Sequence, residues 1–116
     1  MAGRILSNLI EIRQGDSFDM PIHLKSGGKD LDITGFIFKM QVKDNTGKVL
    51  ITKIGDVADA ARGRACISLM PVDTNIAPGD YLTDIQVTFP NGQVHTLFPQ
   101  KIGAVAVFRI TEQVTQ

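Results

Sequence analysis

The side chains best suited to metal binding or nucleophilic catalysis are two histidines and one cysteine, and they lie far apart in the sequence. His23 and His95 each lie in a run of alternating apolar and polar residues, with no cysteine or second histidine nearby. A metal site needs several converging ligands, and a nucleophilic cysteine needs a base beside it. Cys66, between Ala65 and Ile67, is typical of a small buried residue in a strand. The pattern predicts no metal site, no cofactor site and no catalytic pair.

Two pairs of closely spaced carboxylates suggest a different chemistry. Asp30 and Asp32 precede a Thr-Gly turn, where paired carboxylates could bind a divalent cation. They lack the spacing of a calcium loop, however, and aspartate at the start of a strand commonly accepts hydrogen bonds from turn amides. Asp80 and Asp84 flank Tyr81, but a hydrolase needs an acid of raised pKa and a positioned partner, which nothing identifies. We therefore predict structural aspartates and no enzymatic activity.

The charge balance and the hydropathy of the chain bear on its partners. Twelve basic and twelve acidic residues give a formal net charge of zero, whereas nucleic-acid-binding domains usually carry a basic face. No apolar run approaches the length of a membrane span, and the apolar patch at 5–10 is too short and too polar for a secretion signal. We expect no nucleic acid and no membrane as partners, and synthesis in the cytoplasm.

The elements that position these side chains are predicted to be strands. Apolar and polar residues alternate with period two, and turn residues separate the alternating runs. The predicted strands are 9–14, 17–25, 36–42, 48–53, 64–70 and 102–111, together with a hairpin after Tyr81. The pattern predicts an all-β chain, an Ig-like antiparallel β-sandwich of about seven to nine strands with one short helical turn near 71–76. Residues 1–116 are predicted to form a single domain, with 54–62 as a mobile loop.

A structural corner is predicted ahead of the long hairpin. In β-sandwiches a tyrosine near the start of a late strand can form a hydrogen bond back across the preceding corner. Tyr81 follows Pro78 and Gly79 in this way, so we assign the corner to these three residues.

The hairpin turn at 90–92 leaves two registers open. An Asn-Gly two-residue loop would pair Phe89 with Val94. A type I turn with Gly92 as a bulge would instead shift the partner by one residue. The choice decides which residues of the return strand share a face with the preceding strand.

The last predicted strand is apolar on both of its alternating faces. A sandwich strand normally leaves one face in water, so a second cover is expected there. Either the N-terminal segment of the same chain or a neighbouring subunit could supply it. We predict Val105, Val107 and Phe108 as an assembly surface, and the edge strand at 17–25, which contains Pro21, as a second one.

Several motifs resemble those of a known family. The segment 28–35, the alternating strand that follows it and the turn at 44–50 resemble the first half of small phage structural domains. The segments 67–69, 77–81, 84–87 and 91–94 resemble the second half. Over 10–111 the chain resembles tail- and baseplate-associated β-sandwich domains of bacteriophages and prophages, similar to the N-terminal domain of the phage baseplate upper protein. The resemblance implies a virion component that works in assembly, and it transfers no catalytic residue.

The resemblance leads to an expected function. The chain is expected to be a non-enzymatic virion structural protein that acts through protein–protein contacts in a tail, baseplate or connector. Its expected partners are other virion proteins and further copies of itself, and its expected location is the virion, after synthesis in the host bacterial cytoplasm. The alternative is a carbohydrate- or cell-surface-binding Ig-like module, although sugar platforms usually use exposed aromatics and the chain has no tryptophan and one tyrosine.

Overall fold

The computed structural model describes residues 3–6, 8–99 and 105–112. Its two short helical turns are η1 (Ala60–Arg62) and α1 (Pro71–Thr74), and no helix in these residues is long and apolar enough to cross a membrane. The strands are β1 (Gly3–Leu6), β2 (Leu9–Arg13), β3 (Phe18–His23), β4 (Lys25–Ser26), β5 (Lys29–Asp30), β6 (Ile37–Lys43), β7 (Val49–Ile54), β8 (Asp56–Asp59), β9 (Arg64–Leu69), β10 (Gly79–Thr88), β11 (Val94–Phe98) and β12 (Ala106–Thr111).

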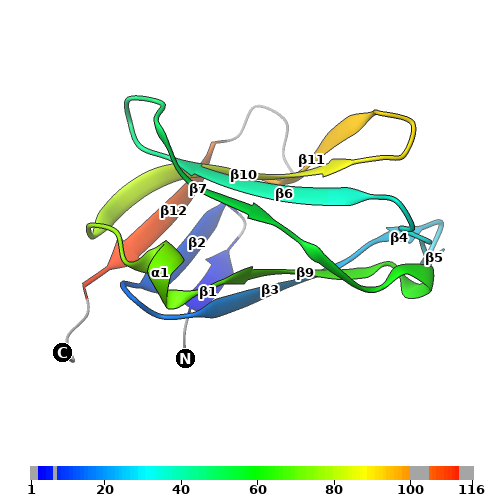
Figure 1. The fold of residues 1–116 in the computed structure, drawn as a ribbon, viewed down its shortest axis with the longest axis horizontal. Coiled ribbons are helices and arrows are strands. Elements are labelled where there is room, and N and C mark those ends of the chain that lie inside the picture. The colour runs from blue at the N-terminus through cyan, green and yellow to red at the C-terminus, as the bar shows by residue number, and fades with distance from the viewer. Residues whose placement is uncertain (1–2, 7, 100–104, 113–116) are drawn as a thin grey trace.

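Two sheets pack face to face (Figure 1). The larger sheet has the order β1-β2-β12-β10-β6-β7, and β11 also pairs with β10. The smaller sheet has the order β3-β9-β8, and β4 and β5 form a separate hairpin. The all-β sandwich predicted from the sequence is therefore confirmed. Two details differ: the described residues form twelve strands rather than about seven to nine, and β12 pairs with β2 in parallel.

The alternation of apolar residues along each strand determines which face enters the core. On β6, Phe38, Met40 and Val42 are fully buried, whereas Ile37 and Lys39 face solvent. The same alternation holds on β10 and β12. Burial of one large apolar side chain contributes about 1.5–3 kcal/mol, so the inward register of each strand is strongly favoured over a one-residue slip.

The segment predicted as a mobile loop at 54–62 is instead a strand and a helical turn. After β7, the chain passes through Gly55 into β8, which pairs with β9 in the smaller sheet. Gly55 packs closely there, because a Cβ would lie 3.0 Å from the Cβ of Phe38 and 3.2 Å from Cγ1 of Ile67. The prediction was wrong because β8 is mostly exposed and lacks the apolar alternation that signals a strand.

The β10–β11 hairpin adopts the second of the two registers left open by the sequence. The Gly92 amide donates to the Phe89 carbonyl oxygen at 2.9 Å, and the Phe89 amide donates to the Gln93 carbonyl oxygen at 2.8 Å. Gly92 has φ +90°, a conformation that glycine adopts without steric cost. This is the turn with a glycine bulge, and it pairs Thr88 with Val94.

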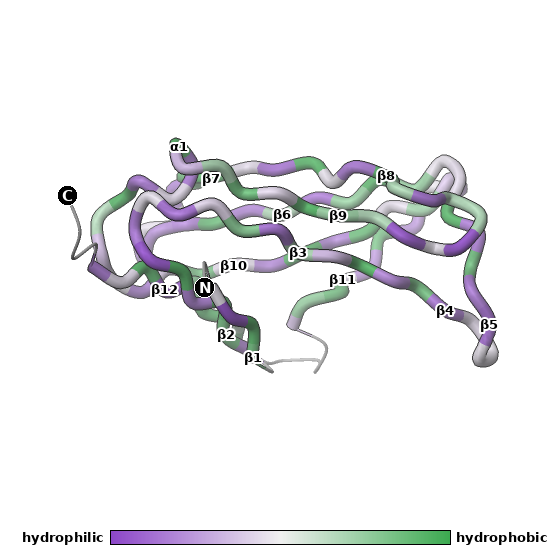
Figure 2. Tube along the Cα trace, turned by 90° about the horizontal axis from the view of Figure 1, so that it is seen from below, coloured by the Kyte–Doolittle hydropathy of each residue, from purple (hydrophilic) through white to green (hydrophobic). Residues whose placement is uncertain are grey.

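The larger sheet curls around the core, so that β12, β2 and β1 lie side by side at one flank of the sandwich (Figures 1 and 2). Its terminal strand approaches the smaller sheet: a Cβ built on Gly3 would lie 3.3 Å from the Phe18 ring. The curl makes the outer face of these strands convex. The first half of β10, which pairs with β12, continues this face.

Candidate functional site

The predicted corner lies at the start of β10. The Tyr81 hydroxyl donates a hydrogen bond to the carbonyl oxygen of Ala77, 2.5 Å away, across Pro78 and Gly79. This bond ties the first residues of β10 to the turn before them. It thereby holds the neighbouring outward-facing positions, Asp80 among them, in place on the larger sheet.

Four charged side chains, which we call the charge row, cross the outer face of β10, β12, β2 and β1. In the sheet register Asp80 lies beside Arg109, Arg109 beside Glu11, and Glu11 beside Arg4. The Nε of Arg109 donates to Asp80 Oδ1 at 2.8 Å, and its Nη1 lies 3.7 Å from Glu11 Oε2. Arg4 Nε donates to Glu11 Oε1 at 2.8 Å. The signs alternate strictly from β10 to β1.

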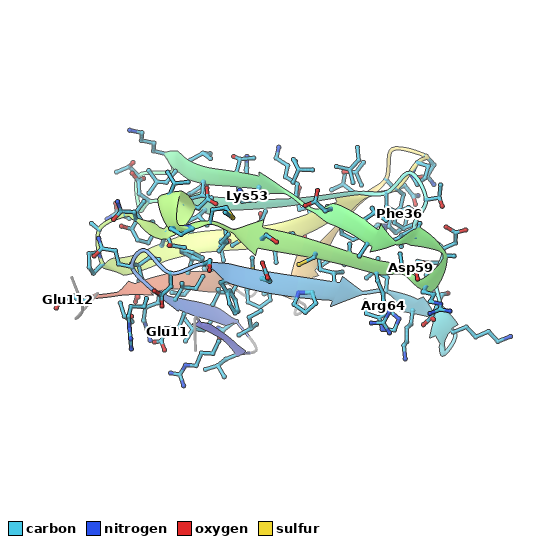
Figure 3. The ribbon with its side chains drawn as sticks, turned by 60° about the horizontal axis from the view of Figure 1, so that its bottom comes forward. Glu11, Phe36, Lys53, Asp59, Arg64 and Glu112 are labelled. Atoms are coloured by element: carbon cyan, nitrogen blue, oxygen red, sulfur yellow. The ribbon has the colours of Figure 1, made fainter. Side chains whose placement is uncertain are left out.

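The side chains of the charge row are directed away from the core. Glu11 points outward from β2 in Figure 3. The hydrogen bonds from Arg109 lower the pKa of Asp80, and the same contacts raise the pKa of Arg109, because both favour the ionised partner. An isolated exposed ion pair stabilises a fold little. The consequence of the row is a fixed pattern of charge on the surface.

A second row, the aliphatic row, lies parallel to the charge row. On each of the same four strands its residue is two positions away from the charged residue, after it on β10 and β1 and before it on β12 and β2. Leu82 lies beside Val107, Val107 beside Leu9, and Leu9 beside Leu6. Leu82 and Leu6 are 45% and 49% exposed, and the two central residues are partly buried by their neighbours. Val105, just before β12, is 60% exposed. Exposed apolar side chains that are grouped rather than scattered often mark interaction surfaces.

The structure divides the predicted assembly surface. Val105 and Val107 lie at the surface, but Phe108 is fully buried in the core, so its inclusion was wrong. The physical reason is the alternation of β12, which turns Phe108 toward the smaller sheet. The N-terminal segment pairs with the edge of β12 and leaves Val107 partly exposed on the outer face. Residues 102–104 of the predicted strand lie outside the described residues.

A hollow adjoins the aliphatic row on the side of β6. Its volume is about 210 Å³, and it is lined by Gln41, Lys43, Leu82, Thr83 and Asp84. The Thr83 hydroxyl donates to the Gln41 carbonyl oxygen at 2.7 Å, which satisfies the one buried hydroxyl in the lining. The hollow therefore extends the outer face with a polar depression next to Leu82.

The histidines and Cys66 lie in separate structural settings. His23 Nε2 lies 2.8 Å from Asp30 Oδ1, and the ring of His95 stacks on Phe89 with 4.7 Å between centroids. Cys66 is half-buried on β9, with its Sγ 3.8 Å from a serine hydroxyl. Within the residues that the structure describes, no three His, Cys, Asp or Glu side chains gather in a way that could hold a metal ion.

The two members of each aspartate pair predicted from the sequence contact different groups in the structure. Asp32 accepts hydrogen bonds from the Thr34 amide and hydroxyl, which lowers the pKa of Asp32, whereas Asp30 faces His23. Asp80 belongs to the charge row and Asp84 lines the hollow. Neither pair converges on a common point.

Sequence reasoning missed most of both rows. The signal was present as a repeated spacing, since each of the four strands carries a charged and an aliphatic residue two positions apart. These pairs are Arg4 and Leu6, Leu9 and Glu11, Asp80 and Leu82, and Val107 and Arg109. The spacing acquires meaning only when the four strands are known to be neighbours in register.

Comparisons with known proteins give matches among solved structures. No protein-family model matches the chain, and no curated protein matches it. Among solved structures, CopC from Methylosinus trichosporium OB3b aligns with 91% of this chain and 86% of its own, at 15% identity and a TM-score of 0.47.

These findings contradict the resemblance to phage baseplate domains. The solved structure is a CopC rather than a phage protein, and neither other comparison supplies a phage relative. The virion structural function and the virion location were therefore wrong, and the carbohydrate-binding alternative gains no support either. The physical reason lies in the motifs: Asp32, Asp44 and Tyr81 all form local turn or corner hydrogen bonds, which any β-sandwich can use.

Proposed function

We propose that this chain is a non-enzymatic protein-binding domain that works through the outer face of β10, β12, β2 and β1. The observation that carries this proposal is the aliphatic row, four apolar side chains that lie adjacent on four neighbouring strands of the outer face, the outer two exposed and the central two partly exposed. An apolar strip beside ordered charges is the composition of a protein interface, which combines apolar contact with polar groups at its margin.

The charge pattern favours a protein partner over nucleic acid or a membrane surface. Phosphate groups are bound by clusters of like positive charge. The charge row instead alternates, with each arginine next to a carboxylate. Such a row suits a partner that presents alternating charges of its own.

The absence of enzymatic activity remains part of the proposal. It is supported by the structural use of the side chains best suited to catalysis. His23 is paired with Asp30, Asp32 and Asp44 hold turns, and Asp80 is held by Arg109.

Site-specific photocrosslinking tests the proposal. A photoreactive amino acid replaces Val107 in the protein expressed in its native cells, and a control carries it at Thr96, which is exposed on β11 of the same sheet. We expect a discrete protein adduct, identified by mass spectrometry, from position 107 and none from position 96. Equal adducts at both positions, or none at 107, would refute the outer face as a binding surface.

A further inference from the structure

We infer that the partner of the outer face is a second copy of this chain, related to the first by a two-fold axis along the strands between β12 and β2. The inference rests on the proposed function and names its partner. Two-fold contacts are self-complementary, so each feature of the surface must fit its own image. The charge row meets this condition.

The order of signs in the charge row is self-complementary under that axis. From β10 to β1 the row runs negative, positive, negative, positive. In the second copy this axis reverses the order of the strands across the face but leaves positions along the strand direction unchanged. The charge row therefore faces the charge row of the second copy, and the aliphatic row faces its aliphatic row. The axis places Asp80 opposite Arg4 of the second copy, and Arg109 opposite Glu11 of the second copy. Each of the four charges faces its opposite, and the ion pairs within each chain are retained.

The aliphatic row meets itself under the same axis. Val107 comes to lie opposite Leu9 of the second copy, and Leu82 opposite Leu6 of the second copy. One operation thus brings apolar groups together and opposite charges together. Complementary charges fix the register of an interface, whereas apolar burial supplies most of its favourable free energy.

Other two-fold arrangements of the same faces are disfavoured by the charges. An axis across the strands, along the charge row, would place Asp80 opposite Asp80 and Arg109 opposite Arg109. An axis across the strands between the two rows would place charges on aliphatic side chains, which would desolvate charges without a partner. Only the axis along the strands matches both rows.

The shape of the face limits the contact. Two convex faces meet first at their centres, so Val107, Leu9, Arg109 and Glu11 form the middle of the interface. Arg4 is the most exposed member of the charge row, with 58% of its side chain accessible, and its length lets it extend toward Asp80 of the second copy. A small contact of this kind predicts a weak, concentration-dependent dimer.

Sedimentation velocity of the full chain tests the inference. We expect the wild type to shift from monomer to dimer as its concentration rises toward ~1 mM. Val107→Asp should raise the dissociation constant at least ~10-fold, whereas Thr96→Asp on β11 should leave it unchanged. A wild type that stays monomeric over this range overturns the second copy as partner.

A charge exchange tests the register itself. The variant Arg4→Glu, Glu11→Arg, Asp80→Arg, Arg109→Glu keeps the alternation, so its internal pairs and its own dimer are retained. Between the variant and the wild type, however, every opposed pair would carry like charges. With the two proteins labelled for energy transfer, we expect signal within each population and none in the mixture. Free mixing would overturn the proposed register, as would a variant that folds by circular dichroism and remains monomeric.

The outcomes separate this inference from the proposed function. A photocrosslink from position 107 to a different protein, with no dimer in sedimentation, refutes the second copy and retains the binding face. A crosslinked product from position 107 with twice the mass of the chain supports both the binding face and the second copy as its partner. The absence of any crosslink together with a monomeric protein refutes both.

Discussion

At the scale of single residues, neighbours along β12 have opposite roles. Phe108 is fully buried, while Val107 on one side of it and Arg109 on the other lie on the outer face. All three belong to one short strand. Valine and phenylalanine are both hydrophobic, so hydrophobicity alone does not predict which of Val107 and Phe108 is buried. What separates them is the direction in which the side chain leaves the pleated strand.

The different roles of Phe108 and Val107 give the first prediction. Phe108→Ala should destabilise the fold by about 3–5 kcal/mol, because it removes a large buried side chain and leaves a cavity. Val107→Ala should cost less than about 1 kcal/mol, since Val107 is only partly buried. Urea denaturation of both variants measures the difference. Equal losses would show that β12 does not present alternate faces to core and solvent.

Asp80 gives a prediction about pH. Because the hydrogen bonds from Arg109 lower the pKa of Asp80 from its ordinary value of 3.8, folding favours its ionised form. The stabilisation is present above that ordinary value and is lost as the pH falls through the lowered pKa of the folded state. Titration of the Asp80 carboxyl carbon by NMR should show the lowered pKa, and Arg109→Gln should raise it again. An Asp80 pKa unchanged by that substitution would exclude Arg109 as the cause.

At the scale of elements, η1 and β9 are joined to the β4–β5 end of the sandwich at Gly63. The Leu24 amide donates to the Gly63 carbonyl oxygen at 2.8 Å, and the Gly63 amide donates to Ala60 at 3.2 Å. Gly63 has φ +69°, and a Cβ there would lie 2.4 Å from the Leu24 carbonyl oxygen and 2.7 Å from that of Leu31. The backbones of three segments therefore meet at a position that only glycine can occupy.

Comparison with Gly47 isolates the effect of this close approach. Gly47 has φ +89° but open space around its Cβ position. Gly47→Ala should therefore cost only the left-handed backbone conformation, about 1–2 kcal/mol. Gly63→Ala adds steric overlap with backbone atoms and should cost about 1–3 kcal/mol more. Chemical denaturation measures both variants, and similar losses would show that the β4–β5 segment moves away from Gly63 easily.

The elements also show how far the sequence can be interpreted alone. Period-two alternation was enough to predict the sandwich and the strand at 36–42, and the Pro-Gly turn ahead of Tyr81 was enough to predict the corner. Alternation could not identify β8, which is mostly exposed, or the hairpin register at Gly92, which depends on turn geometry. The two rows of the outer face depend on which strands are neighbours, and the parallel pairing of β12 with β2 joins residues about a hundred positions apart in the chain. No local pattern contains that information.

At the scale of the whole molecule, the balance of twelve basic and twelve acidic residues determines how salt should act on the proposed dimer. Two copies with a net charge of zero have little long-range repulsion for salt to relieve. Salt should therefore act mainly on the opposed charges of the two charge rows, which it screens as the Debye length falls from about 10 Å at 0.1 M to about 3 Å at 1 M. We expect the dissociation constant of the wild type to rise over this range in sedimentation experiments, and the charge-exchanged variant to respond in the same way. Contact between the aliphatic rows alone would give the opposite sign, because salts that strengthen apolar burial would tighten the dimer. A dissociation constant that falls with added salt would therefore leave the aliphatic row as the contact and remove the charge row from it.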